Sequence, residues 1–167
     1  MVSLIALRGL FLRITLWVLF IALPCGAEML HGKVVGVADG DTLTLLSPDN
    51  NRTRIRLFGI DAPEKSQPFG QKSKASLSEL VFDRNVDVSI ETLDHYGRTV
   101  GSVIYEGNDI NLEQVRRGMA WVYQKYTRDP KYLETEAEAR TTHRGLWRDE
   151  DPSPPWEYRH GEKEHRR

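Results

Sequence analysis

The stretch Arg56-Leu57-Phe58-Gly59-Ile60-Asp61-Ala62-Pro63-Glu64 begins as an apolar strand and ends in two carboxylates separated by a proline. Aspartate and glutamate are rarely buried unless they are paired or bound to a cation, so core packing explains this ending poorly. The proline restricts Ala62 to an extended conformation, which places Asp61 and Glu64 on a stiff turn. The stretch predicts a polar site at a strand end, and its alternative is a plain loop with solvated acids.

Residues 1–27 have the features of a secretory signal peptide. Two arginines precede an apolar run over residues 14–23, and small residues follow it up to Ala27. The run is shorter than the roughly 20 residues that a membrane span needs. This favours a signal peptide cut after Ala27 over a retained anchor, and the preceding proline disfavours a lipid-modified Cys25. We therefore expect an exported protein, periplasmic or extracellular.

The charge and cysteine content of the remaining chain bound its function. The leader holds two arginines and no acidic residue, so removing it leaves 21 basic and 24 acidic residues. It also removes Cys25, the only cysteine, and an exported domain without disulfides must be held by its hydrophobic core. The near-neutral balance argues against a broad basic face that coats nucleic acid, but it allows a local basic site.

Hydrophobic patterning predicts one α+β domain over residues 28–147. One helix follows the third strand and two follow the fifth, and five closing strands suggest a five-stranded OB-fold-like β-barrel with about three helices. The expected strands cover residues 33–38, 42–46, 52–60, 85–90 and 98–105. The expected helices cover residues 71–82, a segment capped by Asn108 or Asp109 and running through Met119, and a segment from Asp129 or Pro130 to His143.

Residues 148–167 differ in composition from the predicted domain. They are dense in proline and charge, which predicts a polar C-terminal tail with little structure of its own. Within this tail, Trp156 is the one residue that we expect to dock on the domain.

Four polar groups stand at the ends of the expected strands, and each has an ordinary structural alternative. Asp39-Gly40 suits a hairpin turn, but this turn does not account for Asp41. Strand alternation puts both arginines of the third strand on the face opposite its apolar residues, where a solvent-facing role is the alternative. The groups are Asp39-Gly40-Asp41-Thr42, Arg54 with Arg56, Asp61 with Glu64, and Asp94-His95-Tyr96-Gly97-Arg98.

Taken together, these groups predict hydrolysis of a phosphodiester. Aspartate oxygens suit a hard cation such as Ca²⁺, and the sequence has no histidine or cysteine cluster that would suggest zinc. Arginines complement phosphate oxygens through bidentate, charge-assisted bonds. A further carboxylate beside the metal can orient or deprotonate a water. A nucleophilic water, a Lewis acid and cations at the phosphorus oxygens are what this reaction requires.

The same motifs resemble those of the staphylococcal-nuclease-like (thermonuclease) family. The resemblance covers about residues 32–147, and its specificity comes from the order of the motifs within one small α+β chain. The matching stretches are DGDT at residues 39–42, RLFGIDAPE at residues 56–64 and DHYGR at residues 94–98, with LEQVRRGMAWV and EAEARTTHRGLW following in order.

For the metal and the attacking water, the resemblance implies a Ca²⁺ site formed by Asp41, Asp61 and the backbone carbonyl of Ala62. Glu64 would be the general base or would position the water. Some relatives carry threonine where Ala62 stands, and because only the carbonyl would bind the metal, we expect activity to persist.

For the substrate, the resemblance implies that Arg56 and Arg98 bind the scissile phosphate and that Tyr96 contacts the nucleotide. His95 replaces a more usual lysine, which weakens one nearby positive charge. A further tyrosine contact has two candidates, Tyr123 and Tyr126.

The expected function is cleavage of DNA and RNA with low sequence specificity, which the family resemblance implies would leave 3′-phosphate ends. We expect a monomer with no stable protein partner and no membrane contact after signal cleavage. The alternative is a catalytically inactive OB-fold module that binds nucleic acid or protein, although such modules would be expected to lack one or more of the five side chains Asp41, Arg56, Asp61, Glu64 and Arg98, all of which are present. An oligosaccharide-binding barrel is consistent with the fold alone and explains neither arginine.

Overall fold

The computed structural model describes residues 28–165, with side chains up to residue 161. The predicted signal peptide, residues 1–27, and its cleavage site lie outside the described residues. Among the residues described, no helix is both long enough and apolar enough to cross a membrane.

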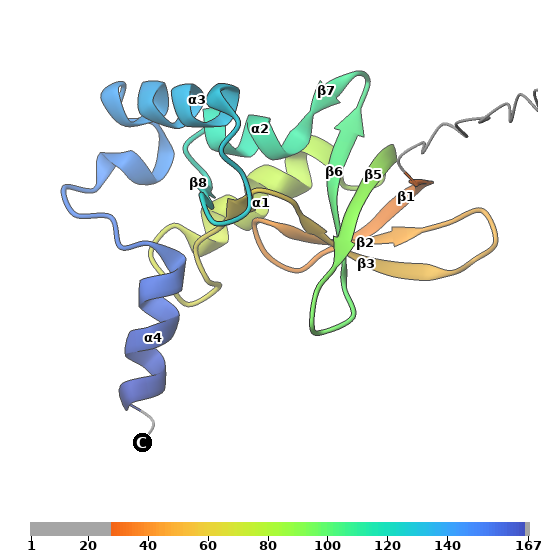
Figure 1. Ribbon diagram of the computed structural model, residues 1–167, viewed down its shortest axis with the longest axis horizontal. Coiled ribbons are helices and arrows are strands. Elements are labelled where there is room, and N and C mark those ends of the chain that lie inside the picture. Colours follow the sequence, from red (N-terminus) through yellow and green to blue (C-terminus); the bar gives the residue numbers. More distant parts are fainter. Residues whose placement is uncertain (1–27, 166–167) are drawn as a thin grey trace, which may run out of the picture.

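Five strands form a closed barrel, as the sequence predicts (Figure 1). Neighbours along the order β3-β2-β1-β5-β6 pair antiparallel, and a parallel pairing of β3 with β6 closes the barrel. The α+β fold class and the OB-fold-like barrel are therefore confirmed. The barrel strands are β1 Met29–Val37, β2 Thr42–Leu46, β3 Arg52–Leu57, β5 Asn85–Leu93 and β6 Thr99–Tyr105.

The predicted third strand is divided, and the division re-aims the chain toward the polar site. Gly59 has a φ of +75°, a conformation that glycine adopts without strain, and it ends the run of β3. The chain then forms the short strand β4, Ile60–Asp61, which leaves the barrel and pairs with β8, Trp121–Val122. Within β3 the alternation holds, because Ile55 and Leu57 are buried and Arg54 is exposed. A further short strand, β7 Asn108–Asp109, pairs with the end of β6.

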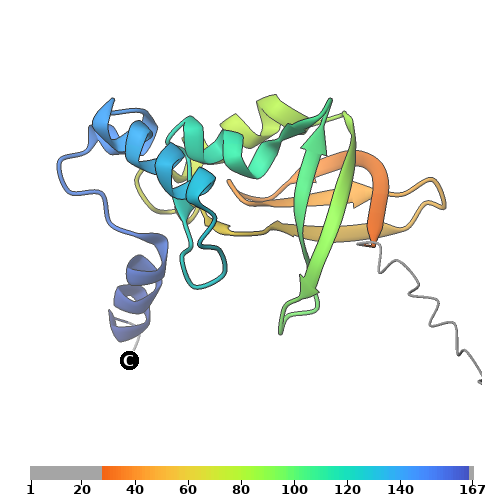
Figure 2. The ribbon, with the colours of Figure 1, turned by 45° about the horizontal axis from the view of Figure 1, so that its top comes forward.

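The helices other than the C-terminal one gather at one end of the barrel in both views (Figure 2). Two of the three predicted helices begin at the expected capping residues: Asp109 accepts a hydrogen bond from the amide of Leu112 at 3.0 Å, and Asp129 accepts one from Lys131 at 2.9 Å. The helices are α1 Gly70–Val81, α2 Ile110–Arg116, α3 Pro130–Thr141, the 3-10 helix η1 Gly145–Arg148 and α4 Pro155–His165.

Two apolar clusters support these elements. The larger fills the barrel and the space under α1 and α2. In the smaller, the rings of Trp121 and Trp147 meet edge to face with centroids 4.4 Å apart, and the guanidinium of Arg140 lies 3.8 Å from the Trp147 ring. Trp156 packs against this smaller cluster, so the expectation that it docks on the domain is confirmed.

The prediction of a C-terminal tail with little structure is wrong for residues 155–165, which form α4. Composition misleads here because the helix gains its support from tertiary contacts of a few side chains rather than from an apolar run. Trp156 stacks on Tyr123, with centroids 5.4 Å apart and ring planes 18° apart. The prolines of the tail lie in the linker before α4 and at the first residue of that helix.

Candidate active site

Asp41 stands at the centre of the polar site, and its role goes beyond the Asp39-Gly40 turn. Its carboxylate is buried, with 2% of the residue exposed. One oxygen, Oδ1, accepts from Nη1 of Arg56 at 2.5 Å and from the hydroxyl of Thr42 at 3.0 Å. The other accepts from the backbone amide of Ala62 at 2.7 Å. Asp41 therefore fixes the start of β2 to the turn that follows β4.

Arg56 joins the two aspartates. It lies in β3 opposite Thr42, and its Nη2 donates to Oδ1 of the fully buried Asp61 at 2.7 Å. Burial lowers the pKa of Arg56, but the charges of Asp41 and Asp61 outweigh it and hold that pKa above the usual value. The guanidinium thus remains a permanent cation between two buried carboxylates.

The pairing with Arg56 does not fully offset the cost of burying the charge of Asp41. Burial raises the pKa of Asp41 to about 7, although the Arg56 guanidinium works in the opposite direction. The neighbouring carboxylates of Asp39 and Asp61 add to the increase. A second cation at this site would therefore stabilise the ionised carboxylate.

Glu64 lies at the rim of the site, with 37% of its side chain exposed. Its backbone amide donates to the side-chain oxygen of Gln67 at 3.1 Å, and its carbonyl accepts from the Gln67 amide at 2.9 Å. These two bonds hold the stiff turn that the proline predicts. They place the Glu64 carboxylate next to Asp61, because both carboxylates contact the same guanidinium, that of Arg159.

Arg159, on α4, is the residue that sequence reasoning missed. Its Nη2 donates to Oδ2 of Asp61 at 2.7 Å, and its Nη1 donates to Oδ1 of Asp61 at 3.2 Å and to Oε1 of Glu64 at 2.6 Å. An arginine in a charged C-terminal segment carries no sequence signal for such a contact. Only the docked helix brings it 95 positions back along the chain to Glu64.

Arg98 and Tyr96 lie in a separate turn between β5 and β6. Arg98 donates through Nε to Asp94 at 2.7 Å and lies 5.5 Å from the centre of the Tyr96 ring, which is 74% exposed. Burial raises the pKa of Asp94, but hydrogen bonds from Arg98 and from the Tyr96 amide outweigh it and leave that pKa below its usual value.

The barrel closure relates this turn to the buried cluster. Arg98 lies immediately before β6, two residues ahead of Val100, and Val100 is the partner of Arg56 in the parallel closure, so this turn adjoins the strand that pairs with β3. The structure thus brings Asp41, Arg56, Asp61, Ala62 and Glu64 into one cluster. It leaves Arg98 and Tyr96 in the turn between β5 and β6, with their described contacts confined to that turn.

The donor set of this cluster fits a hard divalent cation. Within the described residues, no group of three or more histidine, cysteine or acidic side chains forms a ready metal cage. Arg159 instead lies between Asp61 and Glu64, and Arg56 lies between Asp61 and Asp41. Buried carboxylates require a cation, and carboxylate and carbonyl oxygens are the ligands that Ca²⁺ takes. Residues Asp41, Asp61 and Ala62 could therefore hold this ion once Arg159 has moved.

Comparison with known proteins agrees with this chemistry. The sequence model of a family described as "Staphylococcal nuclease homologue" matches residues 54–149, more than half of the chain. An uncharacterized endonuclease of Haemophilus influenzae is 44% identical over 156 residues, which cover 93% of this chain and 88% of the relative. A micrococcal nuclease of Shigella flexneri is 39% identical over 158 residues, covering 87% of this chain and 89% of the relative. The chain therefore belongs to the staphylococcal nuclease homologue family.

Proposed function

We propose that this protein is a Ca²⁺-dependent endonuclease that hydrolyses DNA and RNA with low sequence specificity and leaves 3′-phosphate ends. Hydrolysis of phosphodiester bonds by a nuclease follows from the family and from relatives named endonuclease and micrococcal nuclease. The observation that supports its assignment to this site is the convergence of two buried aspartates, Asp41 and Asp61, on Arg56.

Arg56 is suited to bind the scissile phosphate. Its guanidinium is held on two sides by carboxylates, so it loses little conformational freedom when a substrate arrives. One fifth of its side chain is exposed, which lets a phosphate oxygen approach. Arg98, in the turn before β6, would bind a second oxygen and stabilise the charge that develops on phosphorus.

Glu64 is suited to act on the attacking water. Its carboxylate sits at the rim, where water has access, and the turn bonded to Gln67 limits its movement. In the proposed step, a Glu64 oxygen takes a proton from the water as the water oxygen attacks phosphorus and the P–O5′ bond breaks. The departing 5′ oxygen takes a proton from solvent and becomes a hydroxyl, and Glu64 then releases its own proton to solvent. Because the bond that breaks joins phosphorus to the 5′ oxygen, the phosphate stays on the 3′ side.

The metal ligands of the proposal are Asp41, Asp61 and the carbonyl of Ala62. A Ca²⁺ ion bound there would supply a Lewis acid beside the phosphate. The low specificity follows from the kind of contact, because phosphate-directed arginines and an exposed ring such as Tyr96 read no base edges.

The test is a metal-dependence series with single-stranded and duplex DNA and with RNA, each in Ca²⁺, in Mg²⁺ and in a chelator. We expect cleavage of all three in Ca²⁺ and none in chelator, with products whose 3′ ends lose phosphate on phosphatase treatment. Cleavage that persists in chelator would contradict the metal role. Binding without any cleavage would support the alternative of an inactive binding module.

A further inference from the structure

The two carboxylates assigned above to the metal and to the water are both paired with one guanidinium from α4. Arg159 contacts both oxygens of Asp61 and one oxygen of Glu64, at 2.6 to 3.2 Å. A guanidinium and a divalent cation compete for the same carboxylate lone pairs. Arg159 in this position therefore takes up lone pairs on both oxygens of Asp61 and puts a positive charge beside them, which opposes the binding of an ion there.

The same face of α4 carries a second anchor. Trp156 precedes Arg159 by three residues, so the two side chains lie on one side of the helix. The Trp156 ring stacks on Tyr123 and meets Trp121 edge to face at 5.7 Å. Because Trp121 pairs with Asp61 through β8 and β4, this aromatic contact lies beside the carboxylates that Arg159 binds.

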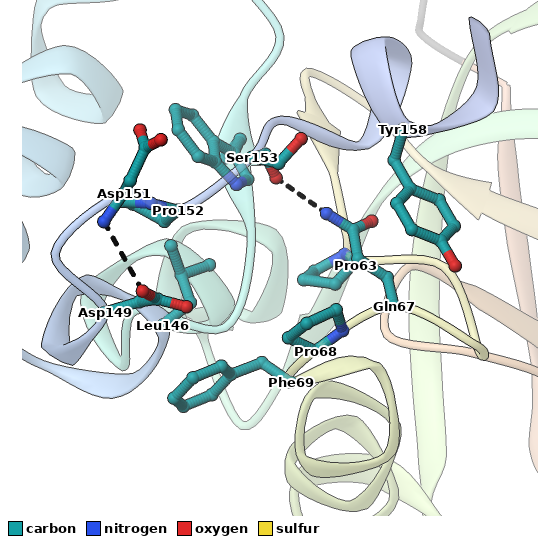
Figure 3. A pocket seen from close by; sticks show the side chains of 11 residues that line it. Pro63, Gln67, Pro68, Phe69, Leu146, Asp149, Asp151, Pro152, Ser153 and Tyr158 are labelled. Carbon is teal, nitrogen blue, oxygen red and sulfur yellow. Dashed lines mark hydrogen bonds between the residues drawn. The ribbon is translucent and has the colours of Figure 1, made fainter. Parts of the chain in front are cut away.

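The linker before α4 is fixed to the turn that carries Glu64. Figure 3 shows the side-chain amide of Gln67 directed at the carbonyl of Ser153, to which it donates at 2.6 Å. Tyr158 donates to the hydroxyl of Ser66 at 3.3 Å. A small cavity of about 90 Å³ remains between the linker and this turn. The helix therefore docks across the rim of the site through side chains and one carbonyl.

Three features favour a reversible contact between α4 and the rest of the domain. The side chains of Arg159 and Glu64 are 36% and 37% exposed, so water screens the ion pair between them and weakens it, although Asp61 is buried. In Figures 1 and 2, α4 stands apart from the other helices and its C-terminal end points away from the barrel. Arg159 also lies ten residues beyond residue 149, where the match to the family model ends.

We propose that α4 is an intramolecular inhibitor of this site, in which Arg159 occupies the place of the divalent cation until the helix is displaced. The inference rests on the proposed function, because it takes the metal ligands from there. Its consequence is quantitative: when only a fraction of the molecules has the helix released, the apparent Ca²⁺ dissociation constant is the intrinsic one divided by that fraction.

The test measures Ca²⁺ binding to the full protein by isothermal titration calorimetry at pH 8, without nucleic acid. Removing a positive charge near a cation site tightens binding by itself, so the decisive variant is Trp156→Ala, which keeps every charge and releases the helix at its other anchor. We expect it to bind Ca²⁺ about three- to tenfold more tightly than wild type. Arg159→Gln should tighten binding at least as much. His160→Gln, an exposed change on the same helix, is the matched control and should leave the affinity unchanged.

A second measurement follows the helix directly through its tryptophan. Saturating Ca²⁺ should shift the tryptophan emission of the wild-type protein to longer wavelength, because Trp156 leaves Tyr123 and Trp121 for water. Trp156→Ala should show no such shift. Thermal unfolding of each variant establishes that the domain is folded before binding is compared.

The outcomes separate this inference from the function on which it rests. If Trp156→Ala and wild type bind Ca²⁺ equally, or if only Arg159→Gln binds more tightly, the inhibitory helix is refuted while the nuclease assignment stands. If neither wild type nor any variant binds Ca²⁺, the proposed metal dependence falls and the inference falls with it.

Discussion

At the scale of single residues, removing the Glu64 carboxylate should lower the cleavage rate and leave the folding free energy nearly unchanged. Glu64→Gln keeps the shape of the side chain but cannot accept a proton from water, so we expect the cleavage rate to fall by about 100-fold or more. The folding free energy should change by less than about 1 kcal/mol, because the side chain is partly exposed at the rim. Initial rates and urea unfolding measure the two effects. Glu79→Gln, an exposed acid on α1, serves as control, and wild-type turnover in Glu64→Gln would remove the base assignment.

Arg56 should instead affect activity and stability together. Arg56→Lys retains the charge but cannot bridge Asp41 and Asp61 with a planar fork. We expect loss of cleavage together with about 1–3 kcal/mol of folding free energy, the usual value of hydrogen bonds to charged groups. The matched control is Arg54→Lys, an exposed position two residues earlier on the same strand, which should change neither quantity. Retention of wild-type cleavage by Arg56→Lys would show that the fork does not contact the phosphate.

At the scale of elements, one buried asparagine on α2 holds the break between β3 and β4. Asn111 is fully buried, donates to the carbonyls of Phe58 and Gly101 at 3.0 and 3.2 Å, and accepts from the amide of Val103 at 3.1 Å. Asn111→Ala removes the hydrogen bonds that its side chain makes to the Phe58 carbonyl and the Val103 amide, while the Gly101 carbonyl keeps its bond from the Phe58 amide, so we expect a loss of about 2–4 kcal/mol in denaturant unfolding. Asn108→Ala, at an exposed position just before α2, should cost less than about 0.5 kcal/mol. Equal losses for both variants would contradict the bracing role.

Asn111 also shows where sequence reasoning stops. Strand alternation and capping residues predicted the barrel and two helix starts, because these signals are local. The helical pattern of α2 gave no sign that Asn111 and Gln114 are buried, since their partners belong to other elements, among them the carbonyl of Gly40 at 2.8 Å from Gln114. Arg159 was missed for the same reason. The candidate site was predictable as a set of residue types, whereas the groups that brace it and cover it depend on tertiary contacts.

At the scale of the whole molecule, export stays a prediction that can be checked on the intact protein. If residues 1–27 are a signal peptide, protein recovered outside the cytoplasm should have a mass that corresponds to a chain starting at Glu28. The variant Ala27→Arg should block cleavage after residue 27 and give a heavier product. A native protein that retains its leader, or that begins at another residue, would contradict the predicted cleavage.

The parallel closure of the barrel by β3 and β6 determines when the newly made chain becomes able to cut nucleic acid. Strand β3 carries Arg56, yet its partner β6 is made more than forty residues later, so the pairing that brings the turn with Arg98 toward β3 does not exist in a nascent or nicked half of the chain. A cut in the connection between α1 and β5, near Asp83, would leave three carboxylates on one fragment and Arg98 on the other. Neither piece should degrade nucleic acid alone, and mixing them should restore activity only to the extent that β3 and β6 reassemble. We therefore expect the nuclease to remain inactive during synthesis until the fifth barrel strand, β6, has been made and has paired with β3.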